Sequence, residues 1–387
     1  MQGSTILFDI AAAFTMTGVH PFLTYGLSLK ALSRMGAASP ALPVPGGSRP
    51  VGSFAVCVCA YNEEAVIALK VENLLALRRA TSVPVDIYLY VDAASDRTAA
   101  LVRPFADRLF LVEATERHGK TAGMNRLAGM ATADVLVFSD ANVMLAPDAL
   151  ERLRDHFNDP EVGCVCGHLA YANGEETDTA AIGSGYWRAE ERLKQLESDT
   201  GGVIGADGSL FAIRRCLHRP VPEDIIDDFY LSLAILCDGH RVIRAEDVRA
   251  FEGATTDSAD EFRRKIRIAC QAFNVHRLMR PSLTKLPWLL RYKYVSHKLL
   301  RWLALVNVGL GGLCFAAGWA EAQGWIVGAA VFALGLAGLM GLALLGRPRE
   351  ILLALLATTI GVGRSLKGDR FQTWRPPVSR DIRTTQS

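Results

Sequence analysis

Residues 54–98 read FAVCVCAYNEEAVIALKVENLLALRRATSVPVDIYLYVDAASDRT, and this stretch decides the fold. Residues 54–60 form an apolar run rich in β-forming residues, and the amphipathic stretch 65–78 predicts a helix after it. Residues 85–91 predict a second strand, which ends just before Asp92. A strand, a helix and a second strand in this order are typical of a sheet with parallel strands.

The alternation continues beyond this stretch. Residues 109–112 and 134–139 predict two further strands, and residues 121–130 and 147–157 predict helices. We therefore expect an α/β fold with a mainly parallel, doubly wound sheet. Ligands of such sheets bind beyond the carboxyl ends of the strands. The polar side chains that fall there are those of Asp92, Asp96, Asp140 and Asn142.

Composition indicates a protein attached to a lipid bilayer. Half of the 387 residues are hydrophobic and the formal net charge is only +2, which argues against nucleic-acid binding. Residues 302–320 and 324–345 are long and apolar enough to cross about 30 Å of hydrocarbon. Residues 6–29 are expected to form a retained anchor, kinked at Pro21, because no basic residues precede them. The run 351–363 is shorter and typical of a re-entrant or interfacial segment.

Basic residues flank these apolar segments and predict their orientation. They are Lys30, Arg34, Lys285, Arg291, Lys293, Lys298, Arg301, Arg347 and Arg349. The positive-inside rule then predicts that the middle of the chain lies in the cytoplasm. The expected setting is a bacterial-type inner membrane, which the protein crosses several times. The expected parts are an anchor at 1–36, a Pro- and Gly-rich tether at 37–52, a globular domain at 53–280, an interfacial helix region at 281–301, a transmembrane region at 302–364 and a basic cytoplasmic tail at 365–387.

Seven short segments carry the polar and glycine residues that suggest chemistry. In chain order they span residues 60–64, 92–96, 120–125, 140–142, 205–215, 227–228 and 264–268. Together they resemble the membrane-bound family 2 glycosyltransferases over about residues 54–301. That group includes synthases of cellulose, chitin, hyaluronan and poly-N-acetylglucosamine, and the ceramide glucosyltransferases. The resemblance implies a GT-A fold for residues 53–280 and a nucleotide-diphosphate sugar, expected to be a UDP-sugar, as donor.

The resemblance also implies a donor site at the first strand ends. Asn62 and Glu63 resemble residues that line the base and ribose, and Asp92 and Asp96 resemble the acidic site near the nucleoside and diphosphate. Lys120 and Asn125 open a helix near the same crevice, where Lys120 would meet the diphosphate with help from the helix N-terminus. Two structural alternatives stay open. Asp96 is also suited to capping the following helix, and Lys120 to a plain surface position.

A divalent cation is expected beside Asp140. The leaving diphosphate gains negative charge that a cation neutralises, and Mg²⁺ and Mn²⁺ accept the oxygen donors that Asp140 and Asn142 provide. Asn142 is neutral where many relatives carry a second aspartate, so lower metal affinity is expected. A solvated turn at the end of the strand is the alternative for residues 139–142.

Asp228 is expected to be the general base, because a carboxylate on the acceptor side can take the proton of the attacking hydroxyl. Asp227 stands where relatives often carry a glutamate, and Asp224 and Asp227 are alternatively suited to capping the next helix. A single base without a covalent intermediate implies inversion of the anomeric centre. Gly205, Asp207 and Gly208 resemble the segment beneath the acceptor, with an ordinary turn as the alternative.

Residues 264–268 depart from the family pattern. Processive synthases carry Gln-x-x-Arg-Trp on an interfacial helix, whereas this chain has Arg264, Arg267 and Ile268 at the positions of the Gln, the Arg and the Trp. Both arginines suit the leaving diphosphate, but Ile268 lacks the aromatic face on which an acceptor sugar stacks. A basic helix on anionic lipid is the alternative. The interfacial character is expected to continue through Trp288, Tyr292, Tyr294, His297, Lys298 and Trp302.

These features together predict an inverting hexosyltransferase that adds a sugar to a glycan or lipid acceptor at the membrane, in exopolysaccharide or glycolipid synthesis. An inactive nucleotide-binding regulatory membrane protein of the same fold is the alternative. A transporter or channel fits poorly, because the spans are few and carry no charge suited to an ion path.

Overall fold

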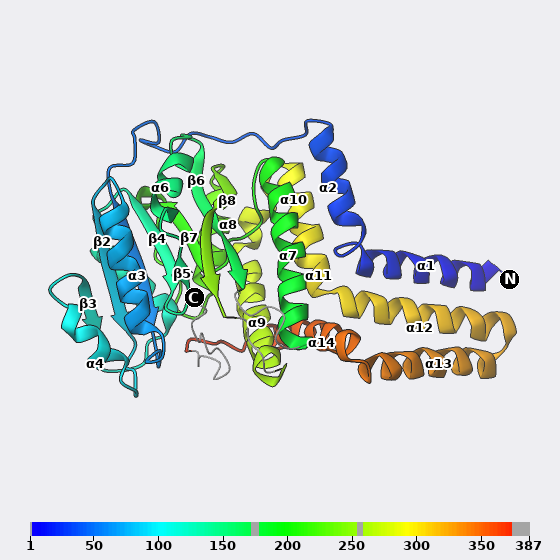
Figure 1. The fold of residues 1–387 in the computed structure, drawn as a ribbon. Helices are drawn as coiled ribbons and strands as arrows, with labels where there is room; N and C mark the ends of the chain where they lie inside the picture. Colours follow the sequence, from blue (N-terminus) through cyan, green and yellow to red (C-terminus); the bar gives the residue numbers. More distant parts are fainter. Residues whose placement is uncertain (1, 172–177, 254–257, 374–387) are drawn as a thin grey trace.

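The computed structural model describes residues 2–171, 178–253 and 258–373 (Figure 1). The strands are β1 (Phe54–Ala60), β2 (Val85–Val91), β3 (Phe110–Glu113), β4 (Val135–Asp140), β5 (Met144–Leu145), β6 (Val162–Tyr171), β7 (Leu210–Arg214) and β8 (Arg241–Glu252). The helices up to α8 are α1 (Gln2–Val19), α2 (Thr24–Arg34), α3 (Ile67–Ala80), α4 (Thr98–Val102), α5 (Lys120–Met130), α6 (Ala149–His156), α7 (Asp178–Asp199) and α8 (Asp227–Cys237). The later helices are α9 (Ser258–Leu283), α10 (Trp288–Tyr294), a π-helix (Val295–Leu299), α11 (Leu300–Trp302), α12 (Ala304–Gln323), α13 (Trp325–Ala343) and α14 (Gly346–Leu366).

Eight strands form one sheet in the order β3-β2-β1-β4-β7-β6-β8-β5. The first four are parallel: Phe54 of β1 lies opposite Val85 of β2 on one side and Val135 of β4 on the other. The chain order therefore reverses beside β1, and the crevice at such a reversal is where α/β sheets bind ligands. The predicted α/β class is confirmed. The second half of the sheet is mixed, because β7 runs antiparallel to β4 and β6, and β5 antiparallel to β8.

Helices cover both faces of the sheet, which explains why its strands are apolar on both sides. Val56 and Val58 of β1 belong to the core beneath α3 and α6, whereas Cys57 and Cys59 belong to the core beneath α5, α8 and α9. The alternation has the period of two that a strand imposes. All eight cysteines are free thiols.

The apolar helices extend away from the sheet. Figure 1 shows α1, α12 and α13 running side by side on the far side of α2 and α10 from the sheet. Within the described ranges, 304–323 and 325–342 are helices long and apolar enough to cross a membrane. Helices α1 and α2 meet these criteria together but bend by 69° at their junction, as the kink predicted at Pro21 requires. Helix α14, which contains residues 351–363, instead packs along α9.

Several residues expected to face lipid lie inside the protein. His297 of the π-helix is fully buried, and its two ring nitrogens lie 2.7 and 2.6 Å from carboxylate oxygens of Glu190 and Glu197 on α7. Arg301 donates to Glu190 at 2.7 Å, and the fully buried ammonium of Lys293 donates to three backbone carbonyls, one in the last turn of α7 and two just after it. Tyr294 and Trp302 are buried as well. Tyr294, His297 and Trp302 are therefore packed inside the protein, while the interfacial helix region expected at 281–301 stays a prediction.

Candidate active site

The residues predicted to bind a donor lie where β1 and β2 end. Asn62 has a left-handed backbone, with φ of 52°, and its amide pairs with Ser95 at 2.9 and 3.1 Å across the crevice. Asp96 accepts hydrogen bonds from the Thr98 N–H at 2.9 Å and the Glu64 N–H at 3.0 Å. These bonds hold the turn that leads into α4, whose N-cap position is Arg97 and carries no side-chain cap, so the structure does not show the capping alternative for Asp96. Donor binding by Asn62, Glu63 and Asp96 stays a prediction.

Asp92 holds the loop that leads into α5. Its carboxylate is fully buried and accepts the N–H groups of His118 at 2.8 Å and Gly119 at 3.0 Å. The Arg117 guanidinium donates to Asp92 at 3.0 Å and lies 3.3 Å from the centre of the Tyr61 ring. Arg117 and Tyr61 thus form one wall of the crevice, and sequence reasoning missed both as site residues. The sequence feature that could have indicated Arg117 is that it is a basic residue three positions before Lys120.

Four segments meet around Lys120. Its ammonium at the start of α5 contacts Asp140 at the end of β4, at 2.6 Å. A methyl group added at Gly208 would lie 2.7 Å from that ammonium and 2.9 Å from Asp228 Oδ2. The predicted residues Lys120, Asp140, Gly208 and Asp228 therefore converge, although they are spread over more than 100 residues of sequence. The surface alternative for Lys120 is excluded, since its ammonium is paired and mostly shielded.

Burial and mutual repulsion set the protonation of this cluster. Asp227 and Asp228 are 3% and 7% exposed. Burial, followed by the neighbouring Asp227 carboxylate, raises the pKa of Asp228 to about 7, while Lys120 opposes the rise. Burial alone would lower the pKa of Lys120, but Asp140, Asp227 and Asp228 together raise it well above its usual value. The site thus holds a permanently charged cation beside a carboxylate that titrates near neutrality.

The alternative of helix capping by Asp227 is not what the structure shows. In the described part of the chain, α8 has no side-chain cap, and the buried Oδ2 of Asp227 has no hydrogen-bond partner. Asp224 pairs with Arg370 at 2.8 Å instead. Asp228 Oδ1 accepts the N–H of Phe229 at 2.5 Å, which fixes the carboxylate at the start of the helix.

The oxygen donors near Asp140 fit a divalent cation held partly by its substrate. Asp140 is about one-third exposed, at 33%, whereas Asn142 is buried and its amide nitrogen donates to Glu252 at 2.9 Å. The amide oxygen of Asn142 lies on the opposite branch of the side chain. Within the described residues, no three His, Cys, Asp or Glu side chains form a closed metal cage. Mg²⁺ and Mn²⁺ commonly use one or two carboxylates together with substrate phosphates, so this donor set suits them.

The segment after α7 carries Gly205, Asp207 and Gly208, and their role beneath an acceptor stays a prediction. Gly205 has φ of 93° and packs against the Phe229 ring, where an added methyl group would clash. Asp207 accepts the Lys194 ammonium at 2.8 Å and a hydrogen bond from Ser209. The Ala206 N–H donates to Ser232 on α8 at 2.8 Å. These contacts hold Gly208 against Asp228, so the segment is a fixed wall of the site rather than an ordinary turn.

Gly208→Ala is expected to lower kcat/KM at least about tenfold, because the methyl group would displace Lys120 and Asp228, and shifts of about 1 Å can cost 10²-fold. Steady-state kinetics checks this. Gly129→Ala on α5 is the matched control, since nothing lies within 4 Å of its added methyl group. Equal kcat/KM for the two variants would contradict the geometry.

Asn125 and the α9 residues have partners outside the Lys120 cluster. The Asn125 amide exchanges hydrogen bonds of 2.7 and 2.9 Å with the Val221 backbone, so it holds the segment before Asp227. Arg264 pairs with Glu261 at 2.8 Å, and Arg267 donates to Gln271 at 3.1 Å. The donor role of Asn125 and the diphosphate role of both arginines stay predictions. Ile268 is partly buried on the same helix.

The C-terminal segment after α14 lies against the start of α5. Gln271 of α9 donates to the Phe371 carbonyl at 2.7 Å, and the next carbonyl, of Gln372, lies against Gly119. The Gln372 side chain donates to Glu223 at 2.7 Å. This segment lies outside the stretch that resembles the family, and no periodic or motif signal marks it. The remainder of the predicted basic tail, 374–387, is outside the described residues.

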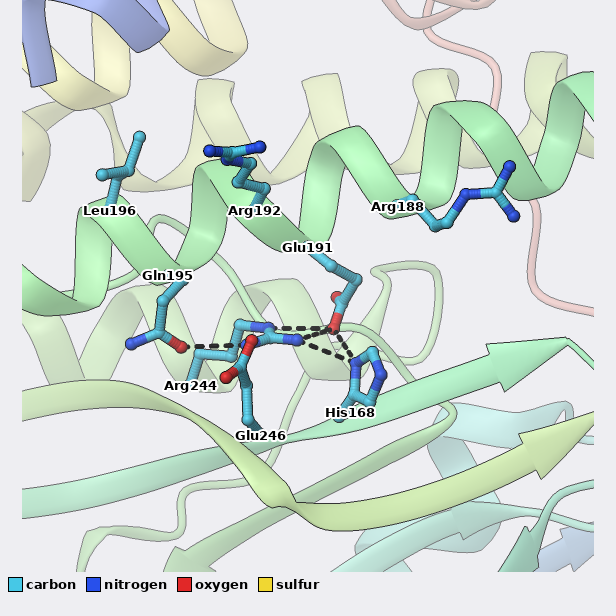
Figure 2. A pocket seen from close by; sticks show the side chains of 8 residues that line it. All are labelled: His168, Arg188, Glu191, Arg192, Gln195, Leu196, Arg244 and Glu246. Atoms are coloured by element: carbon cyan, nitrogen blue, oxygen red, sulfur yellow. Dashed lines mark hydrogen bonds and ion pairs between the residues drawn. The ribbon is translucent and has the colours of Figure 1, made fainter. Parts of the chain in front are cut away.

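A second polar cavity lies between α7 and the strands β6 and β8. Figure 2 shows Arg244 pointing at Glu191, Gln195 and His168, and these pairs are 2.9, 2.9 and 2.8 Å apart. Arg188 and Arg192 at the rim point away from this cluster. Glu191 lies one helical turn before Lys194 and pairs with it, and Lys194 in turn pairs with Asp207. The polar groups of this cavity are therefore linked through Lys194 to Asp207, in the segment of residues 205–208.

Comparison with known proteins agrees with this arrangement. Residues 55–219 match the model of glycosyl transferase family 2. An N-acetylglucosaminyltransferase of Rhizobium meliloti (strain 1021) is 26% identical over 325 residues, which are 79% of this chain and 76% of that protein. A beta-monoglucosyldiacylglycerol synthase of Synechocystis is 28% identical, over 55% of this chain and 47% of that protein. A hyaluronan synthase of Streptococcus pyogenes is 27% identical, over 47% and 45% respectively.

A solved structure extends the likeness to the whole chain. The mannosyltransferase PcManGT from Pyrobaculum calidifontis, in complex with GDP-Man and Mn²⁺, has a TM-score of 0.69 at 23% identity. The match covers 93% of this chain and 99% of that chain. The likeness shows the fold, and it confirms the predicted GT-A arrangement.

Proposed function

Since the chain is a family 2 glycosyltransferase, we propose that it moves a sugar from a UDP-sugar to a glycan or lipid acceptor at the membrane, with inversion of the anomeric centre. The observation that carries this proposal is the Asp228 carboxylate, with its pKa near 7, beside Lys120 and Asp140 at the ends of the parallel strands. A base is most useful when its pKa lies near the working pH. Sugar transfer near neutral pH needs such a group.

The residues divide into a donor side and an acceptor side. Lys120 would bind the diphosphate, with the α5 N-terminus adding positive charge, and Asp92 would keep the Gly119 backbone in place. On the other side, Asp228 would take the proton of the acceptor hydroxyl as its oxygen attacks the anomeric carbon. The bond from that carbon to the diphosphate oxygen breaks as the new glycosidic bond forms. A single displacement of this kind inverts the anomeric centre.

Asp140 and the Asn142 oxygen would hold the divalent cation, Mg²⁺ or Mn²⁺. The bound cation would neutralise charge on the leaving diphosphate. A solved relative of the same fold contains Mn²⁺ together with a nucleotide sugar, which supports this choice. Arg267 would add charge from α9, whose Gln271 anchors the C-terminal segment over the donor loop.

The acceptor is proposed to come from the membrane side. The curated relatives make glycans or glycolipids by name, and the chain has two helices suited to spanning a bilayer. Basic residues beside these helices favour a cytoplasmic catalytic domain in a multi-pass inner-membrane protein. Nucleotide sugars are available on that side.

Product length tests the acceptor side. We expect short products from the wild type, because Ile268 offers no aromatic face to retain a growing chain. Ile268→Trp should lengthen products or tighten acceptor binding, since an aromatic contact adds roughly 0.5 to 1.5 kcal/mol. Arg267→Ala should lower turnover without changing length. Sizing the products of all three proteins on one gel checks this, and long polymer from the wild type would refute the role given to Ile268.

The donor is tested with purified protein and a panel of labelled UDP- and GDP-sugars, followed by mass spectrometry of the products made in native membranes. Transfer from one UDP-sugar with an inverted linkage is expected. Transfer from a GDP-sugar would correct the donor. Absence of both transfer and hydrolysis with every nucleotide sugar would favour the alternative, an inactive nucleotide-binding regulator.

A further inference from the structure

Lys70 is an ionisable residue in an apolar place, and burial lowers its pKa to about 7. Its side chain on α3 is 0% exposed, and its neighbours on the same helix face, Ile67, Val71 and Leu74, belong to the apolar core beneath the sheet. Removing an ammonium group from water is unfavourable unless partners compensate for it. Methionine or leucine would fill this position without that penalty. Stability therefore does not explain the lysine.

The partners of Lys70 bracket the cation-binding residues. Its ammonium donates to Ser139 Oγ at 2.9 Å and to the Val143 carbonyl at 2.5 Å. Asp140 and Asn142 lie between these two residues in the sequence. Lys70 is thus hydrogen-bonded to the turn just before and just after the groups that would hold the cation.

Two further sets of hydrogen bonds hold the same turn and its neighbours. One helical turn after Lys70, the Asn73 amide exchanges hydrogen bonds of 2.9 and 3.0 Å with the Leu145 backbone. The buried Ser139 hydroxyl donates to the Ser209 carbonyl at 3.0 Å, next to Gly208. One face of α3 therefore supports residues 139–145, and through Ser139 it is linked to the acceptor segment.

We propose that Lys70 is a positioning residue for the cation site: it fixes the turn from Ser139 to Val143 so that Asp140 presents its carboxylate to a divalent cation. The inference rests on the proposed function, in which Asp140 holds that cation. Lys70 acts through Ser139 and Val143. It is not a catalytic residue.

Lys70 has two opposite effects on cation affinity, so the direction in which affinity changes when Lys70 is replaced tests the proposal. In its protonated form the Lys70 ammonium repels a divalent cation, so removal of that charge alone would tighten cation binding. Its hydrogen bonds hold the ligand in place, and outer-shell partners of this kind change metal affinity by about 10- to 100-fold. We expect the second effect to prevail.

The test is Lys70→Met, which removes the charge and the donors but keeps an unbranched side chain of similar length. Mn²⁺ is titrated into the full-length protein with UDP present, and binding is followed by calorimetry. The apparent Mn²⁺ dissociation constant should rise about tenfold or more. The melting temperature should stay the same or rise, and excess Mn²⁺ should restore turnover. Lys70→Gln keeps a shorter, uncharged hydrogen-bond donor, so its apparent Mn²⁺ dissociation constant should lie between those of the wild type and Lys70→Met. This variant replaces Lys70→Met in the test if the methionine variant does not fold.

Lys293→Met is the matched control. Lys293 is equally buried and also donates to backbone carbonyls, those of Glu197, Thr200 and Gly202, but it lies on the acceptor side. Its variant should leave Mn²⁺ affinity unchanged. Unchanged or tighter affinity in Lys70→Met, or equal losses in both variants, would overturn the proposal while the proposed function stands. Metal-independent UDP binding by the wild type would overturn the cation assignment and, with it, this inference.

Discussion

Asp228→Asn is expected to lower turnover by about 10² to 10⁴-fold while donor affinity stays nearly unchanged. Asparagine keeps the size of the side chain and its oxygen, which can still accept the Phe229 N–H. It cannot accept the proton of the attacking hydroxyl. Because Lys120 and Asp140 remain in place, the diphosphate site should keep its charge. Initial rates and UDP binding, measured on the same preparation, separate the two quantities.

The pH profile gives a second signature of Asp228. Its pKa is raised to about 7, mainly by burial and then by Asp227. The base works only when deprotonated, so wild-type turnover should rise with pH through about 7 and level off above it. This rise should be absent from the residual activity of Asp228→Asn. A wild-type rate that is flat between pH 5 and about 9 would contradict the assignment.

Stability provides the control for this variant. A folded-state pKa above the usual 3.8 means that the folded protein binds this proton more tightly than the unfolded chain does. The stabilising contribution is therefore full at low pH and is lost as pH rises through about 7. Above that pH, Asp228→Asn removes a buried repulsive charge and should be at least as stable as wild type. Most of the activity surviving in a well-folded variant would remove Asp228 from the mechanism.

Asp140→Ala is expected to weaken metal-dependent UDP binding by at least about 100-fold. Loss of an outer-shell partner already costs about 10- to 100-fold in metal affinity, and Asp140 is the proposed carboxylate ligand itself. The variant also leaves Lys120 without its 2.6 Å partner, so some metal-independent UDP binding should remain through the free ammonium. Calorimetry with UDP, in Mn²⁺ and in a chelator, distinguishes the two modes.

Asn142 requires a paired substitution. Asn142→Asp alone adds a charged ligand, which the sequence suggests should tighten cation binding. In the structure, however, the Asn142 amide donates to the buried Glu252, so the new carboxylate would face another one. We expect Asn142→Asp to destabilise the fold, and Asn142→Asp with Glu252→Gln to restore the hydrogen bond and bind Mn²⁺ more tightly than wild type. Equal Mn²⁺ affinity in the double variant and wild type would exclude residue 142 as a ligand.

Sequence periodicity located the elements well in the first half of the domain. The strands expected at 54–60 and 85–91 have these bounds in the structure, and the other predicted elements shifted by one to two residues. Parallel strands between helices are buried on both faces, so their apolar runs are easy to recognise. Strands β5 and β8 of the mixed half were not predicted, because β5 has only two residues and exposed polar residues interrupt the apolar pattern of β8.

Side-chain roles were harder to predict than positions. Asp92 and Asn125 form hydrogen bonds with backbone groups of the 118–119 loop and of Val221, and Asp96 accepts the Thr98 N–H in the turn before α4. His297 is expected at a lipid interface from its place before an apolar helix, yet two glutamates 100 and 107 residues away surround it. Such pairings depend on contacts between distant residues, which local spacing does not encode.

The sequence by itself determined the class of fold and the edge of the sheet that carries the chemistry. Parallel strands all end at the same edge, so acidic residues that follow them must gather there. Only the tertiary structure decided which of these groups meet. It placed Asp228 against Lys120 and Gly208, buried Lys70 behind Asp140, and brought Gln372 over Gly119. Burial and charge at these contacts set the pKa of Asp228, because desolvation depends on what surrounds a side chain in space.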